Sequence, residues 1–260
     1  MRGFPYDAHI HTDATGGRDG LAEVVRAAEA QGLELAVIAT AETPANETAD
    51  GEDLRDRVRE IVRADVLSPV LIVPAIETQI ADAQGKISLN GSLGRLAPVV
   101  YTALGGRTDG IALNPPASKQ RYLSNIFQAL LTAVQNPLVT ALARPFNIGQ
   151  FPAPLSPSQM PRSALTELAA AMDEYDVAFE LSNQMHWWFP ELSVEEFIGE
   201  YAALVSVFSR RNVKFVVSSD AMSAGAVGNQ GFVLRLMEEA GVERPQVIDL
   251  PRMIKSGRAG

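Results

Sequence analysis

An apolar run of strand length followed by a helix-like segment recurs seven times along the 260 residues. Nearly unbroken apolar runs are typical of parallel strands that are covered on both faces. The expected strands comprise residues 6–12, 33–40, 70–76, 99–104, 138–143, 177–181 and 214–218. Strand–helix alternation over this length predicts one α/β domain spanning residues 1–260, and seven repeats favour a closed parallel barrel over an open sheet.

Turn and capping residues divide this pattern into elements. Asp19 is expected to cap a helix over residues 20–31 that stops at Gly32. Ser193 and Glu196 have the spacing of a capping box at the start of a helix that reaches residue 211. Other helices are expected at residues 50–66, 118–135, 163–175 and 232–240, and a hairpin or excursion at residues 78–87.

Composition restricts the chemistry that the chain can support. It has no cysteine, so a bound metal must take imidazole and carboxylate ligands, which suit Zn, Mn or Fe. The formal net charge of −9 argues against a nucleic-acid surface. No apolar run has the length of a membrane span, and the N-terminus lacks a signal-peptide pattern. We therefore expect a cytoplasmic protein that binds neither membrane nor nucleic acid, and the sequence does not indicate its oligomeric state.

In parallel barrels the chemistry lies at the carboxyl ends of the strands. His9 and His11 stand two residues apart at the first strand end, so their side chains should point the same way, with Asp7 behind them on that face. Two adjacent imidazoles can hold one metal ion, although a half-buried strand also explains such a pair. Later strand ends carry Glu77, Arg144, Asn183 and Asp220.

The motifs at these strand ends resemble those of the PHP family, named for polymerase and histidinol phosphatase. The matching segments are residues 7–12 (Asp-Ala-His-Ile-His-Thr), 73–77 (Val-Pro-Ala-Ile-Glu), 143–146 (Ala-Arg-Pro-Phe), 179–183 (Phe-Glu-Leu-Ser-Asn) and 218–222 (Ser-Ser-Asp-Ala-Met). The resemblance covers nearly the whole chain. It implies a distorted (β/α)7 barrel with metal-dependent phosphoesterase chemistry.

The departures from the family pattern suggest a smaller metal site. A usual member holds three ions, but here Thr40, Ala41 and Glu42 replace an Asp-His pair, and Arg144 and Met222 replace histidines. The four positions that the resemblance assigns to one ion are kept, namely His9, His11, Glu77 and Asp220. We therefore expect a single divalent ion, since four nitrogen or oxygen ligands suffice for a catalytic site.

The resemblance also suggests roles for the neighbouring residues. Asp220 could accept a proton as well as bind metal. Arg144 could anchor a phosphate or carboxylate of a small anionic substrate, or brace the strand ends in an ion pair with Glu180 or Asp220. Asp7 could orient a histidine ring or bond the backbone. Arg18, Lys119 and Asn183 are further candidates for binding substrate.

Two segments near the expected mouth carry no assigned role. The proline-rich residues 145–161 could be a linker, but a compact domain seldom has so long a loop unless the loop covers a site. The third histidine, His186, precedes Trp187 and Trp188, which could wall the pocket or simply pack against that loop.

Three functions are compatible with these residues. The first is a metal-dependent hydrolase of a small phosphate ester. The second is a hydrolase or lyase of a non-phosphate bond such as an amide, because a His-x-His site with one ion also resembles the amidohydrolase arrangement. The third is an inactive domain that binds a ligand.

Overall fold

A computed structural model of the chain describes residues 3–41, 52–89 and 91–257. Glu42, one of the departures noted above, and the first residues of the helix expected at 50–66 lie outside this part.

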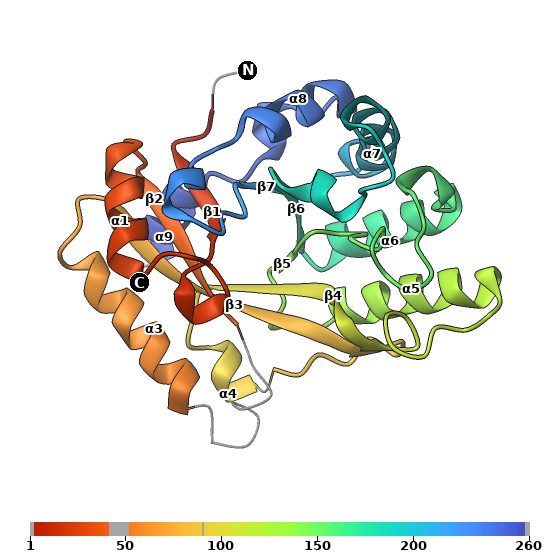
Figure 1. Cartoon of the computed structure of the whole chain (residues 1–260), viewed down its shortest axis with the longest axis horizontal. Helices are drawn as coiled ribbons and strands as arrows, with labels where there is room; N and C mark the ends of the chain where they lie inside the picture. The colour runs from red at the N-terminus through yellow and green to blue at the C-terminus, as the bar shows by residue number, and fades with distance from the viewer. Residues whose placement is uncertain (1–2, 42–51, 90, 258–260) are drawn as a thin grey trace.

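Seven parallel strands form one sheet in the order β1 to β7, each pairing with the next along the chain (Figure 1). Their bounds are Tyr6–Ile10, Leu35–Ala41, Leu71–Asp82, Val99–Asp109, Ala141–Leu142, Ala178–Ser182 and Phe215–Ser218. At the end of β1, Ile10 bridges Ala221 in parallel just past β7, and the His11 N–H donates to the Ala221 carbonyl at 2.9 Å. The sheet is thus a nearly closed (β/α)7 barrel, as the sequence predicts.

Several strand bounds differ from those expected. The third strand, β3, continues past Glu77 to Asp82, and β4 passes through Gly105 and Gly106 to Asp109 instead of ending there. Asp82 and Asp109 pair at the far end of this extension, whose exposed polar side chains make it resemble a loop in sequence. The fifth strand keeps only Ala141 and Leu142. A reversal at Gly85 (φ 83°) brings Ile87 back against Ile80, so the expected hairpin exists but begins later.

Helices cover the outside of the barrel (Figure 1). They are α1 Leu21–Ala30, α3 Glu52–Asp65, α4 Gly91–Gly94, α5 Lys119–Val134, α6 Arg162–Glu174, α7 Val194–Ser209, α8 Gly231–Ala240 and α9 Leu250–Gly257. The α9 helix was not expected from the sequence. The capping box at Ser193 and Glu196 is confirmed.

The expected cap of α1 is wrong. Gly20 occupies the N-cap position without a side-chain hydrogen bond, and the Asp19 carboxylate instead accepts the Ala224 N–H at 2.7 Å. Asp19 therefore ties the loop after β1 to the loop after β7, at the junction that closes the barrel.

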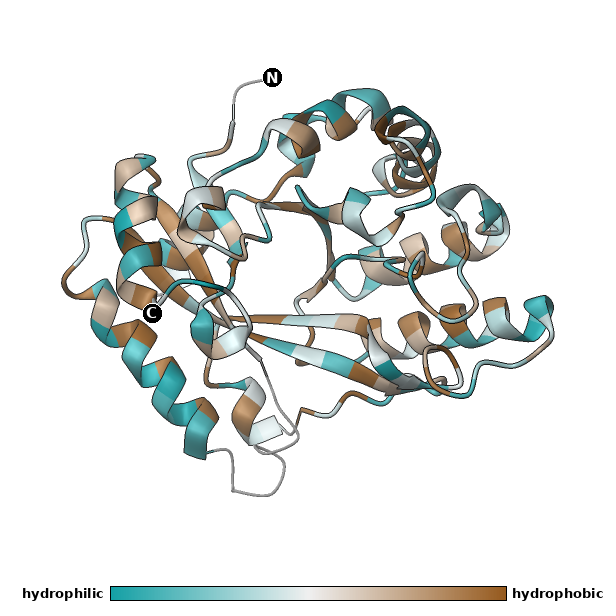
Figure 2. Ribbon diagram, viewed as in Figure 1, coloured by the Kyte–Doolittle hydropathy of each residue, from teal (hydrophilic) through white to brown (hydrophobic). Residues whose placement is uncertain are grey.

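The core lies between the strands and the inner faces of the helices. Figure 2 shows apolar residues along the strands and polar residues on the outer face of α3, whose buried side chains are Leu54, Val58 and Ile61. A cluster of buried aromatic rings, including Phe179 of β6, Phe208 of α7 and Phe215 of β7, packs these strands against α7. This packing fixes the strand ends on which the polar residues stand.

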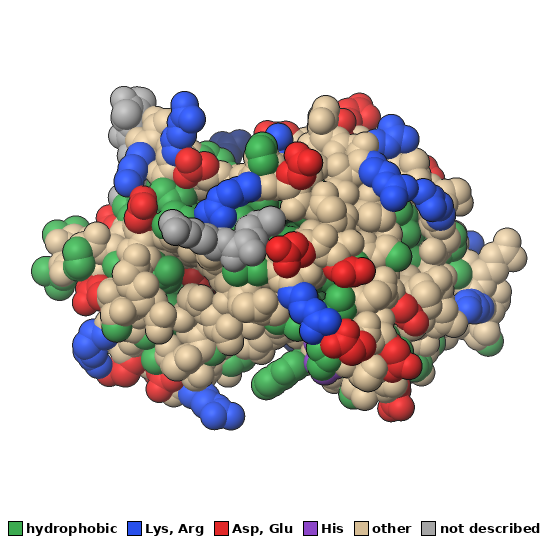
Figure 3. All heavy atoms as spheres, turned by 90° about the horizontal axis from the view of Figure 1, so that it is seen from above, with side chains coloured by type: hydrophobic (Ala, Val, Ile, Leu, Met, Phe, Trp, Pro, Cys, Tyr) green, Lys and Arg blue, Asp and Glu red, His purple; other side chains and the backbone are tan. Residues whose placement is uncertain are grey.

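The outer surface carries both signs of charge. On the face drawn in Figure 3, acidic and basic side chains are interspersed. Of the helices described, none combines the length and apolar character needed to cross a membrane.

Candidate functional site

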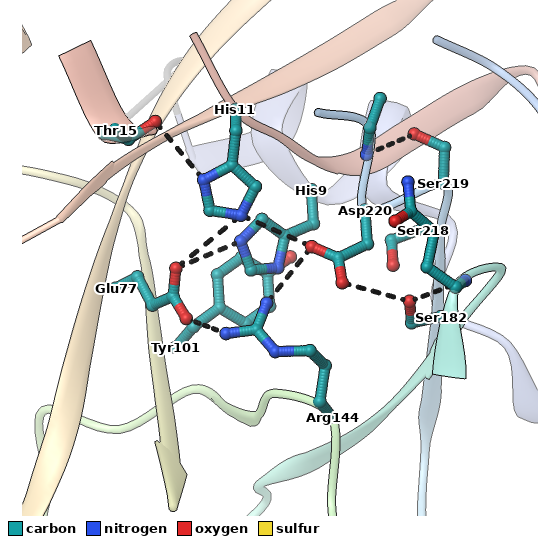
Figure 4. A network of polar contacts seen from close by, with 12 residues as sticks. His9, His11, Thr15, Glu77, Tyr101, Arg144, Ser182, Ser218, Ser219 and Asp220 are labelled. Carbon is teal, nitrogen blue, oxygen red and sulfur yellow. Dashed lines mark hydrogen bonds and ion pairs between the residues drawn. The ribbon is translucent and has the colours of Figure 1, made fainter. Parts of the chain in front are cut away.

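His9 and His11 point to the same side of the chain, as predicted. Their ring centroids lie 4.8 Å apart, and the Oε2 atom of Glu77 lies 3.5 Å from Nε2 of His9 and 3.8 Å from Nε2 of His11 (Figure 4). The ligand atoms of these three residues all fall within 4.8 Å of one another, and both histidines are buried. Strands β1 and β3 thus bring two nitrogens and one carboxylate together at one mouth of the barrel.

The ring of His9 is held from two sides. Its Nδ1 atom lies 2.9 Å from Oε1 of Glu180, which also accepts a hydrogen bond from the Ser218 hydroxyl at 2.7 Å. The Tyr101 ring stacks on the imidazole, with centroids 4.6 Å apart and planes 7° apart. The other ring nitrogen, Nε2, is buried and makes no hydrogen bond with any of the described residues. A buried nitrogen that makes no hydrogen bond but faces a carboxylate and a second imidazole fits a metal ligand.

Carboxylates around His9 determine its charge. Burial lowers the pKa of His9, but the Glu180 carboxylate and then Glu77 outweigh this effect and raise the pKa to about 10. The ring is therefore protonated near neutral pH and balances part of the negative charge at the mouth. A metal ion needs the neutral ring, so it would replace this proton.

We expect the affinity for a divalent ion to increase with pH, because each ion that binds must displace the His9 proton. Below the His9 pKa, the affinity for the ion should increase by about tenfold per pH unit, and about one proton should be released for each ion that binds. Isothermal titration calorimetry in buffers of different ionisation enthalpy measures both quantities. Affinity that stays constant between about pH 6 and about pH 9 would show that His9 is not a ligand.

Arg144 lies between the two acidic residues of the site (Figure 4). Its guanidinium pairs with Oε1 of Glu77 through Nη2 and with Oδ1 of Asp220 through Nη1, the latter at 3.1 Å. Only 11% of the Arg144 side chain is exposed. Burial raises the pKa of both carboxyls, but the guanidinium outweighs it and holds the pKa of Glu77 and of Asp220 well below the usual range. Both acids are therefore ionised at neutral pH.

Asp220 stands beside the group that could hold a metal and not within it. Its Oδ1 atom lies 3.3 Å from Nε2 of His11 but is shared with Arg144, and its Oδ2 atom accepts a hydrogen bond from Ser182 at 3.4 Å. The residues whose ligand atoms lie close enough to share one ion are His9, His11 and Glu77. This is one residue fewer than the set of four expected from the sequence.

The backbone of Arg144 and Asp220 is strained. Both adopt left-handed conformations, with φ of 44° and 52°, that side chains other than glycine rarely occupy. Arg144 is held there by its own N–H, which donates to Oε2 of Glu180 at 2.9 Å. Such strain costs about 1–3 kcal/mol per residue and persists where surrounding contacts impose it. Here it turns the two side chains of the ion pair toward each other.

Asp7 bonds the backbone, which is one of the two roles considered from the sequence. Its carboxylate accepts the Ser219 and Gly228 N–H groups, each at 2.8 Å, and the His9 N–H at 3.4 Å. An extra residue between Asp7 and Ile10 relative to β2 interrupts the strict alternation of β1, on which the expected position of Asp7 was based. Glu180, and not Asp7, bonds the His9 ring.

We expect Asp7→Asn to lower the free energy of unfolding by about 1–3 kcal/mol while changing metal affinity only a few-fold. The amide loses one acceptor for the buried N–H groups after β7 but leaves the His9 ring contacts intact. Chemical denaturation and metal titration of the same preparation measure the two effects. A loss of metal affinity of about 10- to 100-fold would instead assign Asp7 an orienting role.

The remaining residues expected to bind substrate have other positions. The Asn183 side chain accepts the N–H groups of Phe232 and Val233 at 2.9 and 3.3 Å, so it satisfies donors in the first turn of α8. Arg18 is exposed in the loop after β1, and Lys119 is exposed at the first position of α5. None of the three lines the cavity next to the metal group. Their roles in substrate binding stay predictions.

Sequence reasoning missed several residues of the site. Tyr101 stacks on His9, and its hydroxyl donates to the Ala8 carbonyl at 2.5 Å. Tyr101 pairs directly with Glu77 across β3 and β4, so knowledge of the strand register would have identified it. Thr15 lies 3.2 Å from Nδ1 of His11, and Ser182 and Ser218 contact the acidic residues. Polar residues of this kind give no motif on their own.

The fold and the cluster together define a (β/α)7 barrel with a two-histidine, one-glutamate group at its mouth. Histidinol phosphate phosphatase from Lactococcus lactis, in a structure with zinc, L-histidinol and phosphate, is similar over 92% of this chain and 94% of its own, with a TM-score of 0.65 and 14% identity. A cryo-EM structure of archaeal ribonuclease P with mature tRNA contains a chain that is similar over 91% of this chain and 88% of its own, with a TM-score of 0.54 and 12% identity. No protein-family model and no curated protein matches the sequence. At these identities the likeness shows a shared fold alone.

Proposed function

We propose that the protein is a hydrolase of small phosphate monoesters that works with one divalent ion. The observation that carries the proposal is the convergence of Nε2 of His9, Nε2 of His11 and Oε2 of Glu77 beside a cavity lined by His11, Arg144 and Asp220. The similar fold of a phosphatase whose structure holds zinc and phosphate supports it.

Each residue would have a distinct role in the reaction. His9, His11 and Glu77 would hold the ion, which supplies positive charge that activates water and polarises the bond under attack. Asp220 is ionised and lies at the cavity wall, so it can accept a proton from the attacking water. Arg144 lines the same cavity and presents its guanidinium to one phosphate group.

The test is an assay of protein stripped of metal and reloaded separately with Zn, Mn and Fe. We expect hydrolysis of phosphate monoesters with about one ion per chain, and no hydrolysis of amides. Hydrolysis of amides in place of esters would redirect the proposal to non-phosphate bonds. Absence of activity with every ion, in protein that binds the ion, would contradict an enzymatic role.

Binding of nucleic acid needs a separate assay, because the similar ribonuclease P structure contains tRNA. The formal net charge of −9 and the mixed surface charge support the prediction that this chain does not bind RNA (Figure 3). Gel-shift measurements at low salt check it.

A further inference from the structure

A cavity of about 390 Å³ adjoins the metal group and has two chemically different walls. His11, Arg144 and Asp220 form the wall that belongs to the site already described. We call the remaining lining residues the second wall; they are Gln150, Gln184, Trp187, Trp188 and Met222, from the loops after β5, β6 and β7. The second wall has no assigned role.

We infer that this second wall is a subsite for a flat, uncharged group, so that the substrate is an aryl phosphate or a similar monoester with a planar leaving group. The inference rests on the proposed function for the phosphate and on the wall itself for the planar group. The substrate class follows from charge, shape and rigidity of the wall.

Charge limits the substrate to one anionic group. Among the described residues that line the cavity, Arg144 is the only lysine or arginine, and its guanidinium is already paired with Glu77 and Asp220. The second wall carries amides, indoles and a thioether and no ionisable side chain. A second phosphate or carboxylate placed there would lose its hydration without meeting a cation.

Trp187 provides an uncovered apolar surface. It is 69% exposed at the cavity, although tryptophan is on average among the well-buried residues. Trp188 beside it is partly buried against the core and anchors the short helix η3, Met185–Trp188. An exposed indole at the edge of a cavity offers a face on which a planar group can stack.

The wall is fixed by contacts with the proline-rich loop. Gln150 donates a hydrogen bond from Nε2 to the Trp187 carbonyl. Gly149 packs so closely that a Cβ atom there would lie 2.2 Å from the Trp188 carbonyl oxygen. The two loops therefore hold the backbone that carries the indoles before any ligand arrives, which reduces the entropy lost on binding.

The two tryptophans are the only ones in the chain, so their fluorescence reports on the subsite independently of catalysis. Full-length protein, metal-free and metal-loaded, is titrated with phenyl phosphate, methyl phosphate and inorganic phosphate, with N-acetyltryptophanamide as the control for non-specific quenching. We expect saturable changes in emission, and binding of phenyl phosphate about tenfold tighter than that of methyl phosphate, because the ring buries its apolar surface on the indole.

Variants assign this preference to the wall. Trp187→Ala should remove the roughly tenfold preference for phenyl phosphate, and Trp187→Phe should retain most of it, with Trp188 as the reporter in both. Gly149→Ala should weaken the preference by displacing the Trp188 carbonyl. The matched control is Tyr175→Ala, which removes a 45% exposed aromatic ring that does not line the cavity.

The outcomes separate this inference from the proposed function. Equal affinity for phenyl and methyl phosphate, or a preference that survives Trp187→Ala, would overturn the subsite even if both esters are hydrolysed. A preference for phenyl phosphate that disappears in Trp187→Ala would support the subsite even if no ester is hydrolysed, and in that case the proposed function alone would fail.

Discussion

Glu77→Gln is expected to lower the affinity for a divalent ion by more than about 100-fold and to abolish hydrolysis. This loss exceeds the roughly 10- to 100-fold loss that is usual when a residue that only hydrogen-bonds a metal ligand is replaced. The Oε2 atom of Glu77 is the carboxylate oxygen that faces both histidines, whereas its Oε1 atom is held by Arg144. Glutamine has the same size but lacks the negative charge that attracts the ion. Calorimetric titration and metal content per chain measure the loss.

Two further variants serve as references for this result. Glu34→Gln removes the charge of a 57% exposed glutamate that lies 4.0 Å from Lys255, and it should leave metal affinity unchanged. Glu180→Gln weakens the partner of the His9 Nδ1 atom and should cost about 10- to 100-fold. If Glu77→Gln retained the ion while Asp220→Asn lost it, Asp220 would be the ligand and the assignment made here would be wrong.

The barrel could be predicted from the sequence because its signal is repeated. Each buried parallel strand leaves an apolar run, and seven of them with intervening helices leave few alternatives. The extensions of β3 and β4 could not be predicted in the same way. Beyond Glu77, Thr78 to Ile80 still pair with Thr102 to Leu104, and the extension ends with the pair Asp82 and Asp109. Exposed polar side chains, such as those of Gln79 and Arg107, give these residues the appearance of a loop.

The site was predictable as far as strand ends determine it. His9, His11, Glu77 and Asp220 meet at one mouth because the carboxyl ends of neighbouring parallel strands do so. The partners of the His9 ring were not predictable, since they depend on the irregularity in β1 and on the register of β4 and β6. The sequence left open whether Arg144 anchors substrate or braces the strand ends.

The contacts of Arg144 give Glu77 and Asp220 different roles toward a metal ion. Glu77 can give Oε2 to an ion while keeping Oε1 on the guanidinium, because the two oxygens face different partners. Asp220 has no such freedom, since its Oδ1 atom is the one nearest both His11 and Arg144. While Arg144 holds that oxygen, three protein ligands remain for the ion, which is the number typical of catalytic zinc sites with an open position.

Arg144→Gln should therefore bind the ion more tightly and hydrolyse substrate more slowly. Removing the guanidinium takes a positive charge away from the site and frees Asp220 to become a fourth ligand, so we expect affinity to rise about tenfold or more. Without metal, the same variant removes the guanidinium that balances the charge of Glu77 and Asp220 and should lose about 3–5 kcal/mol of stability. A bound ion restores their balance of charge, so the metal-induced rise in melting temperature should be larger than in the wild-type protein.

Thermal unfolding with and without metal, combined with calorimetry, tests this expectation without an activity assay. Arg144→Lys is the matched control, because it keeps the charge but loses the planar fork that contacts both carboxylates. It should fall between Arg144→Gln and the wild-type protein in metal affinity. Weaker metal binding by Arg144→Gln would contradict this expectation, because it would show that the guanidinium helps to build the metal site.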